Sequence, residues 1–410
     1  METKKRIPIG LTIFYVAALA FCIGYLFGQS PIAPLNVFNQ NLANISADNP
    51  EDLAAFSEVW DLLHERYYKQ PLDDTLLVEG AIDGMLATLE DDHTRYLSPQ
   101  DQKAAEESMS GEFQGIGAEV EGVDGNITIV SPIDGSPAEA AGLQPGDILQ
   151  EADGTVLTGM DVSDAAALVR GPAGTTVTLV VVRDGESFTV EITRDVIQLA
   201  SARGEMLEDE IAYIRLSRFA NNTAEELDGI LPELMAQNPT GLILDLRRNP
   251  GGALDTTVEI ADEFLDEGVV LVERFGDGRL REFESTDKGI AEEVPLVVLI
   301  DEGSASASEV LSGAIQDTER GILIGQQSFG KGTVQTWHTL SNFGGVRVTI
   351  AEWLTPDQDS IHKVGLEPDY FIPLGESLDE DPQLQAAIDY LRGETIVSVP
   401  PEPEMAEDEN

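Results

Sequence analysis

The chain has 410 residues, 42% hydrophobic and 6% aromatic, which is enough for two or three domains with their own cores. It contains 24 lysines and arginines and 75 aspartates and glutamates, so the formal net charge is −51. A field of this sign repels phosphate backbones and disfavours nucleic-acid binding. The acidic residues either keep the surface well solvated or attract basic substrates, and the sequence leaves both explanations open.

Residues 7–28 form an uncharged run that predicts a transmembrane helix. As a helix this run spans roughly 33 Å, which matches a hydrocarbon core of about 30 Å. Lys4, Lys5 and Arg6 precede it, so the positive-inside rule places the rest of the chain outside the cytoplasm, on the periplasmic or cell-surface side. A cleaved signal peptide is the alternative, but a clear small-x-small cleavage site is missing, which favours an uncleaved anchor. Because the only cysteine, Cys22, lies here, no intrachain disulfide, cysteine metal cluster or thiol nucleophile is expected.

Two amphipathic helices are predicted after a polar linker over about residues 30–50. Apolar residues recur at helical spacing at Phe56, Val59, Trp60, Leu63 and Tyr67, and again at Leu77, Ala81, Ile82, Met85 and Leu89. The segment 91–99 then breaks the pattern. Its Asp91-Asp92-His93 run is interpreted as a turn with a helix cap rather than a metal site, because the chain has only four histidines.

Residues 111–195 predict a small β-rich domain. Its short β-branched runs lie at 127–130, 148–152, 175–182 and 187–193, and helices are predicted after Ser136-Pro137 and over Val162–Val169. This order resembles a PDZ domain, with Gly115-Ile116-Gly117-Ala118 in the position of that family's carboxylate-binding loop. Glycines let backbone N–H groups converge on an anion, and an edge strand pairs with an extended peptide.

Beyond Val196 strands and helices alternate, which predicts an α/β core with a largely parallel sheet. Strands are expected at 211–216, 241–246, 269–273, 295–300 and 321–324, and helices at 223–237, 255–265 and 306–316. Sites in this architecture gather where strand carboxyl ends meet helix amino ends. The loops 245–252 and 303–308 satisfy that condition. A short helix at 384–391 and a disordered acidic tail are predicted to end the chain.

A serine cluster, Ser304-Ala305-Ser306-Ala307-Ser308-Glu309, lies in the second of these loops. A serine at a sharp strand-to-helix turn exposes its hydroxyl, as a nucleophile requires. Helix capping by Ser304 or Ser306 is the competing interpretation.

A serine nucleophile needs a base. His338 or His362, with an acid such as Asp369 or Asp245, is one candidate, although nothing in their spacing singles them out. Lys331, between Gly330 and Gly332, is the other, provided that burial lowers its pKa from about 10.4 towards neutrality.

The segment from Gly325 to Lys331 is almost a phosphate-binding P-loop. A P-loop needs serine or threonine directly after its lysine and a helix beyond, whereas Gly332 and a β-like sequence follow here. Nucleotide hydrolysis is therefore disfavoured.

Several motifs together resemble the carboxy-terminal processing proteases, also called tail-specific proteases, over roughly residues 52–376. They are the run Ser304 to Glu309, Phe-Gly-Lys-Gly-Thr-Val-Gln at 329–335, Asp-Leu-Arg-x-Asn-Pro-Gly-Gly at 245–252, the PDZ-like domain and Gly-Leu-Glu-Pro-Asp at 365–369. The resemblance implies an α/β core with a parallel, crotonase/ClpP-like sheet and an inserted PDZ domain. The domains then expected are 1–50 (cytoplasmic stub, anchor and linker), 51–110 (helical region), 111–195 (PDZ), 196–376 (protease core) and 377–410 (helix and tail).

The resemblance also implies roles for single residues. It makes Ser306 the nucleophile, Lys331 the general base and Gln335 the support of the lysine side chain. Backbone N–H groups of Ala307 and of Gly251 or Gly252 would form the oxyanion hole, worth several kcal/mol in such sites.

Two assignments stay open at this point. In an ideal strand Lys331 and Gln335 would lie about 13 Å apart, so a bend at Gly332 must bring them together or Gln335 acts less directly. The resemblance also implies that Arg170 couples the PDZ domain to the protease core. The alternative is that Arg170 is a solvated surface arginine without such a role. The chain also departs from the family at Gln326-Gln327 and at 357–359, which affects the substrate contacts near the mouth of the site.

The function expected is that of a membrane-anchored, extracytoplasmic serine endopeptidase that cuts proteins near their C-termini and binds their tails through the PDZ domain. No metal or organic cofactor is expected. The expected partners are protein or peptide substrates with free C-termini and the membrane, and a homodimer is compatible with the sequence. A non-catalytic PDZ adaptor on a protease-like scaffold is the alternative.

Overall fold

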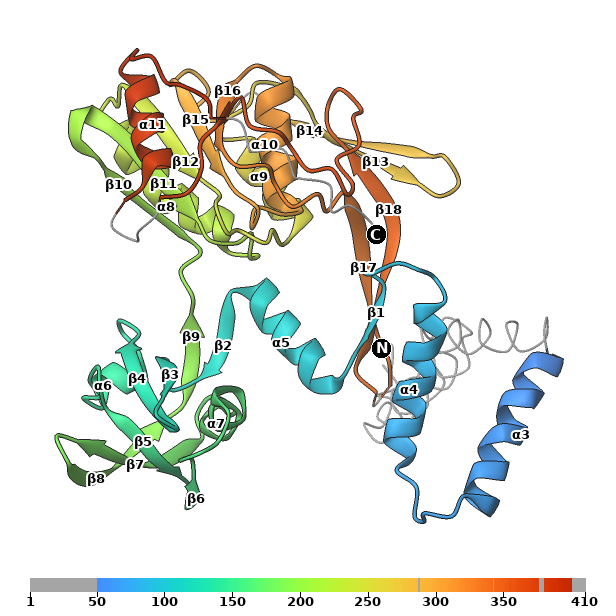
Figure 1. Cartoon of the computed structure of the whole chain (residues 1–410). Helices are drawn as coiled ribbons and strands as arrows, with labels where there is room; N and C mark the ends of the chain where they lie inside the picture. The colour runs from blue at the N-terminus through green and yellow to red at the C-terminus, as the bar shows by residue number, and fades with distance from the viewer. Residues whose placement is uncertain (1–49, 287, 342, 376–379, 400–410) are drawn as a thin grey trace, which may run out of the picture. The chain divides into compact units, whose positions relative to one another are not determined.

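The structure is a computed structural model that describes residues 50–399 except 287, 342 and 376–379. The predicted transmembrane run at 7–28 and most of the predicted acidic tail lie outside these residues. None of the helices described combines the length and apolar character that crossing a bilayer requires. The chain divides into two units, residues 1–78 and 79–410, which are taken separately (Figure 1).

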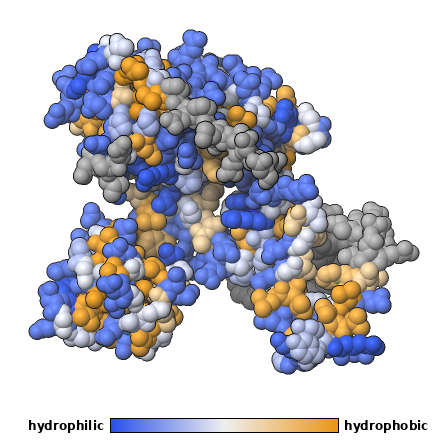
Figure 2. All heavy atoms as spheres, in the orientation of Figure 1, coloured by the Kyte–Doolittle hydropathy of each residue, from blue (hydrophilic) through white to orange (hydrophobic). Residues whose placement is uncertain are grey.

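The first unit contains α3 (Pro50–Arg66) and the start of α4 (Asp74–Ala87). Both helices were predicted from apolar spacing. His64 Nε2 lies 2.8 Å from Asp74 Oδ1 and so ties the end of one helix to the start of the other. Phe56, Val59 and Leu62 of α3 are about half exposed, and Figure 2 shows hydrophobic residues on the surface of these helices.

A six-stranded antiparallel sheet in the second unit has the order β3-β4-β5-β7-β8, with β6 paired to β5. Its elements are β3 (Ala118–Val123), β4 (Asn126–Pro132), β5 (Ile148–Ala152), β6 (Thr155–Val156), β7 (Thr176–Arg183), β8 (Glu186–Thr193), α6 (Pro137–Ala140) and α7 (Val162–Val169). Ser136 and Asp161 cap the two helices, as their sequence positions predict. A separate ladder of β2 (Glu112–Gly115) and β9 (Asp195–Gln198) flanks this sheet in the sequence. The region is the PDZ-like unit that the sequence predicts.

The second six-stranded sheet is parallel except at one edge, with the order β10-β11-β12-β15-β16-β19. Its strands are β10 (Ala202–Met206), β11 (Ile211–Leu216), β12 (Gly241–Asp245), β15 (Leu296–Ile300), β16 (Gly321–Gly325) and β19 (Tyr370–Phe371). The helices of this part of the chain are η1 (Glu208–Glu210), α8 (Thr223–Met235), α9 (Leu254–Ala261), α10 (Ala307–Asp317) and α11 (Pro382–Leu391).

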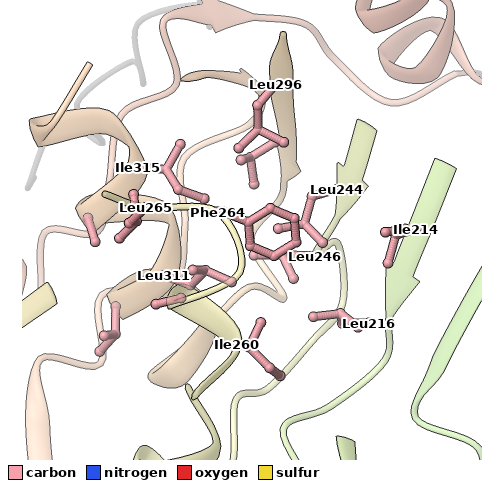
Figure 3. Close-up of a cluster of buried hydrophobic side chains, with 14 of the residues drawn as sticks. Ile214, Leu216, Leu244, Leu246, Ile260, Phe264, Leu265, Leu296, Leu311 and Ile315 are labelled. Atoms are coloured by element: carbon pink, nitrogen blue, oxygen red, sulfur yellow. The ribbon is translucent and has the colours of Figure 1, made fainter. Parts of the chain in front are cut away.

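Both faces of this sheet are buried, because its strands alternate between two cores. Leu242 and Leu244 of β12 pack with α8, α9 and α10, whereas Ile243 packs with α11. Figure 3 shows Phe264 in the first core beside Leu244 of β12 and Leu246, which follows that strand. The near-continuous apolar runs of these strands follow from that double burial.

An antiparallel sheet of order β1-β18-β13-β14, with β17 paired to β18, completes this unit. Its strands are β1 (Arg95–Leu97), β13 (Gly268–Phe275), β14 (Leu280–Ser285), β17 (Thr333–Thr339) and β18 (Gly345–Leu354), and α5 (Pro99–Ser110) follows β1. Strand 269–273, predicted within the parallel alternation, therefore belongs to a different sheet as part of β13. Alternating patterns identify strands but not their neighbours, because pairing partners lie far apart in the chain.

The turn predicted at 91–99 is confirmed. Asp91 accepts hydrogen bonds from the His93 amide at 3.0 Å and the Thr94 hydroxyl at 2.6 Å, and Ser98 caps α5. These contacts commit the Asp91 carboxylate to the turn.

Candidate active site

Ser306 lies at the turn between β15 and α10. Its φ of 55° and ψ of −113° are a left-handed backbone conformation that side chains rarely adopt. Strain of this kind commonly marks a functional turn. The side chain is half-buried, whereas Ser304 and Ser308 are fully buried.

The other two serines hold the turn against the 245–252 loop. The Ser304 hydroxyl donates to the Leu246 carbonyl at 2.8 Å, and the Ser308 hydroxyl donates to the Asn249 carbonyl at 2.9 Å. That carbonyl also accepts from the Ala305 amide at 3.0 Å. Of the two serines in the capping alternative, Ser306 occupies the N-cap position of α10, where its amide donates to Glu309, whereas Ser304 bonds the loop. Ser306 is also the accessible serine of the cluster.

Gly251 of the loop lies directly against the serine turn, whereas Gly252 lies against the Phe219 backbone. A Cβ added to Gly251 would meet the Ala305 carbonyl at 2.6 Å and the Ala307 amide at 2.8 Å. The Gly251 amide donates to the Asn249 side chain. Within the described residues, by contrast, no recorded hydrogen bond uses the N–H of Gly252 or Ala307. The amides of Ala307, which follows Ser306, and of Gly252, which follows Gly251, are therefore unclaimed donors.

Lys331 follows β16 and precedes β17. Burial, together with the charges of Arg347 and Arg95, lowers its pKa to about 8, against the opposing effect of Glu309. Trp353 Nε1 donates to the Lys331 carbonyl at 3.0 Å and so fixes this backbone. A substantial fraction of Lys331 is thus neutral near pH 8.

Glu309 joins the two segments. Its fully buried carboxylate accepts hydrogen bonds from the Ser306 amide at 2.8 Å and the Lys331 amide at 2.9 Å, both on Oε2. Its other oxygen accepts from the Ser328 hydroxyl and the Gly330 amide, each at 2.6 Å. The backbone nitrogens of Ser306 and Lys331 therefore both lie within hydrogen-bond distance of Glu309 Oε2.

The sequence reasoning assigned Glu309 no role. A signal existed, because serine at a helix N-cap followed by glutamate three residues later predicts a carboxylate that turns back to the cap amide. The further contacts with Gly330 and Lys331 depend on tertiary structure.

Gln335 lies on β17, where its amide donates to the Thr333 hydroxyl at 2.8 Å. Among the described residues, no hydrogen bond joins Gln335 to Lys331 or the Ser306 hydroxyl to the Lys331 side chain. The ladder shifts register between Val334 and Gln335, so the chain is irregular here rather than an ideal strand.

The histidine alternative has no support in the described residues. His338 is exposed, and Nδ1 of His362 is buried without a partner. Asp245 instead pairs with arginines, and Asp369 accepts from the Leu323 amide. Neither acid orients a histidine towards Ser306. The strand β17 after Lys331 also differs from the helix that a P-loop requires.

A buried network of ion pairs stabilises the beginning of the 245–252 loop. Arg247 bonds Asp245 and Asp381, the cap of α11, each at 2.7 Å. Asp245 also accepts from Arg215 and from Tyr213, whose pKa rises to about 12 through burial and the neighbouring carboxylate. The C-terminal helix therefore anchors the same loop that carries Gly251.

A groove of about 510 Å³ lies between β3 and α7 of the PDZ-like unit. Its apolar floor includes Ile116, Ile127, Leu149 and Val169, all buried. The predicted carboxylate loop 115–118 borders it. Among the described residues, no hydrogen bond uses the N–H of Ile116 or Gly117, and Gly117 has a left-handed φ of 75°. These amides are available to an anion.

Arg170 ends α7 and borders the same groove. Its Nη1 lies 3.2 Å from Glu107 Oε2 on α5, and its guanidinium lies over the Phe113 ring at 5.1 Å. The side chain is about half exposed. Arg170 thus contacts an element outside the predicted PDZ range.

Known protein families match three parts of the chain. The model of peptidase family S41 matches residues 210–372, the PDZ domain model matches 128–183, and the activating protease CtpB N-terminal domain model matches 17–101. A peptidase core combined with a PDZ domain is the class of protein that the fold and the matches define.

Curated relatives narrow this class. The chain is 35% identical to the carboxy-terminal-processing protease of Bartonella bacilliformis, over 93% of this chain and 98% of the relative. It is 37% identical to the carboxy-terminal processing protease CtpA of Bacillus subtilis, over 97% and 83% of the two chains. The chain belongs to the carboxy-terminal processing proteases, the serine peptidases of family S41. A crystal structure of an S41 protease from Bacteroides fragilis shares its fold, with a TM-score of 0.51, 16% identity, and coverage of 81% of this chain and 92% of that one.

Proposed function

We propose that this protein is a membrane-anchored, extracytoplasmic endopeptidase that cuts proteins near their C-termini with a Ser306/Lys331 dyad. The observation that carries the proposal is the Glu309 carboxylate, which holds the backbones of both residues on one oxygen. The accessible Ser306 and the lowered pKa of Lys331 supply the nucleophile and the base.

In the first step neutral Lys331 Nζ accepts the proton of the Ser306 hydroxyl as Oγ attacks the peptide carbonyl. The N–H groups of Ala307 and Gly252 donate to the resulting oxyanion, since the Gly251 amide is already used. Lys331 then protonates the leaving amine, and water hydrolyses the acyl-enzyme. Catalytic hydrogen bonds are often long in unliganded enzymes and shorten when substrate binds. The missing hydrogen bond between the Ser306 hydroxyl and the Lys331 side chain is therefore compatible with this mechanism.

Tail capture is assigned to the PDZ groove. The free amides of Ile116 and Gly117 take the terminal carboxylate, and β3 pairs with the extended tail. The last side chain enters the apolar floor. Arg170 couples this unit to α5 through Glu107.

The test uses a substrate protein with a free, unstructured C-terminal tail. Wild-type protein is expected to shorten it, whereas Ser306→Ala and Lys331→Ala reduce the rate by about 10⁴-fold or more. Lys288→Ala, at an exposed lysine, is the matched control and should cut normally. Equal cleavage by all variants would refute the dyad, and no cleavage by wild type would favour the adaptor.

The membrane anchor rests on the amino-terminal run 7–28 and its preceding basic residues. We expect the mature protein to keep its original amino terminus and to sediment with membranes. Mass spectrometry of the intact protein checks this, and an amino terminus that begins near Gln29 would contradict it.

A further inference from the structure

Glu119 of β3 lines the PDZ groove, and Glu121 lies two residues further along the same strand. This strand is at the edge of its sheet, so one side of its backbone is available for pairing. Ala118 and Val120 pack against the PDZ core, whereas Glu119 and Glu121 point to the opposite face and are exposed. Strand alternation thus separates an apolar row from an acidic row.

A tail held by its carboxylate meets these rows in a fixed register. With the carboxylate on the amides of Ile116 and Gly117, the last residue of an antiparallel tail lies opposite Ala118. The penultimate residue then lies opposite Glu119, and the fourth from the end lies opposite Glu121. Directly opposed residues project to the same face of a sheet, with Cβ atoms about 5 Å apart.

Both acids lack an ion-pair partner among the described residues. The structure records no ion pair of Glu119 or Glu121 with any described residue, and their partners on β4 are the neutral Ser131 and Thr128. Arg170, the basic residue that lines the groove, pairs with Glu107. Two unpaired carboxylates therefore border alternate positions of a bound tail.

We propose that this groove selects tails that end in an aliphatic residue and carry lysine or arginine at the penultimate position and at the fourth position from the end. This inference rests on the proposed binding of substrate tails by the PDZ groove, and it specifies which class of tail the groove prefers. The overall negative charge of the protein attracts any basic peptide, so the distinguishing feature is the dependence on position.

The experiment measures peptide binding by fluorescence anisotropy at low salt, with the full chain carrying Ser306→Ala to prevent cleavage. The reference peptide ends in Ala-Ala-Ala-Leu, and others place one lysine at the penultimate position, at the fourth from the end or eight residues upstream. Each of the first two lysines should tighten binding about two- to fivefold more than the upstream lysine.

Substitution of each acid identifies its partner. Glu119→Gln should remove the gain at the penultimate position alone, and Glu121→Gln should remove the gain at the fourth position alone. Glu191→Gln is the matched control, because this exposed residue lies on β8 at the opposite edge of the sheet. It should preserve both gains.

The outcomes separate the two levels of the proposal. Amidation of the peptide terminus should weaken binding of every peptide, and no effect of amidation, or no binding at all, would overturn tail capture and this inference together. Amidation-sensitive binding with equal gains at all three lysine positions, or with gains that persist in both glutamine variants, would overturn the charge preference alone.

Discussion

Replacing Lys331 by methionine is expected to abolish cleavage and to stabilise the fold at neutral pH. The side chain is mostly removed from water, and burial lowers its pKa from 10.5 to about 8. Holding the charged form in this place costs about 3 kcal/mol, from about 1.4 kcal/mol per pKa unit. Methionine fills similar space without a charge, so we expect a gain of about 2 kcal/mol in the free energy of unfolding at pH 7.

The pH dependence follows from the sign of the shift. The pKa of Lys331 is lower in the folded state than in the unfolded state, so between about pH 8 and pH 10.5 the unfolded chain binds more protons. Wild-type stability should therefore gain a contribution as the pH rises through this window, and the penalty is complete below it. Lys331→Met should lack that contribution. The kcat/KM of wild type should rise with pH to a plateau above about 8.

Urea unfolding of both proteins from pH 6.5 to 10.5 checks the stability, and cleavage rates over the same range check the base. A Lys331→Met protein less stable than wild type at pH 7 would contradict the burial argument. A wild-type rate independent of pH from 6.5 to 9 would contradict the role of Lys331 as base.

Glu309→Gln should lower kcat about 100-fold and destabilise the fold by about 2–4 kcal/mol. The buried carboxylate accepts four hydrogen bonds, from Ser306, Ser328, Gly330 and Lys331. A glutamine amide replaces one accepting oxygen by a donor, which leaves buried N–H groups unpaired and separates the two backbones. KM should change little, because Glu309 lies within the protein and contacts no groove residue.

Cleavage kinetics with a saturating tail peptide and thermal unfolding measure the two effects. Glu302→Gln is the control, because Glu302 is exposed on the same turn. It should leave kcat and stability unchanged. If Glu309→Gln loses stability but keeps its kcat, the carboxylate maintains the fold without positioning the dyad.

Local patterns in the sequence predicted much of this structure. The strands 211–216 and 148–152 and the helix 162–169 have their predicted bounds, because turn residues and caps mark their ends. The proximity of the 245–252 loop to the serine cluster also followed from the sequence, since neighbouring parallel strands end at one edge.

Other features depend on contacts that are distant in the chain. The salt bridge between Arg247 and Asp381 joins residues 134 positions apart, and no local pattern pairs them. No bounds were predicted for α5, which follows the predicted cap, because its sequence is polar and has little apolar periodicity. The contacts of Glu309 with Ser328, Gly330 and Lys331 depend on where the Lys331 loop lies, which no local pattern predicts.

The two halves of the site come from different structural layers. The Ser306 turn and the glycine loop follow β15 and β12, which are neighbours in the parallel sheet, whereas Lys331 immediately precedes the antiparallel β17. Under the proposed mechanism, the parallel sheet therefore positions Ser306 and the amides that bind the oxyanion. The segment before the antiparallel β17 supplies Lys331, which takes the proton from Ser306. Under the same proposal, substitution of Lys331 alone is expected to abolish cleavage while the PDZ groove still binds the substrate tail.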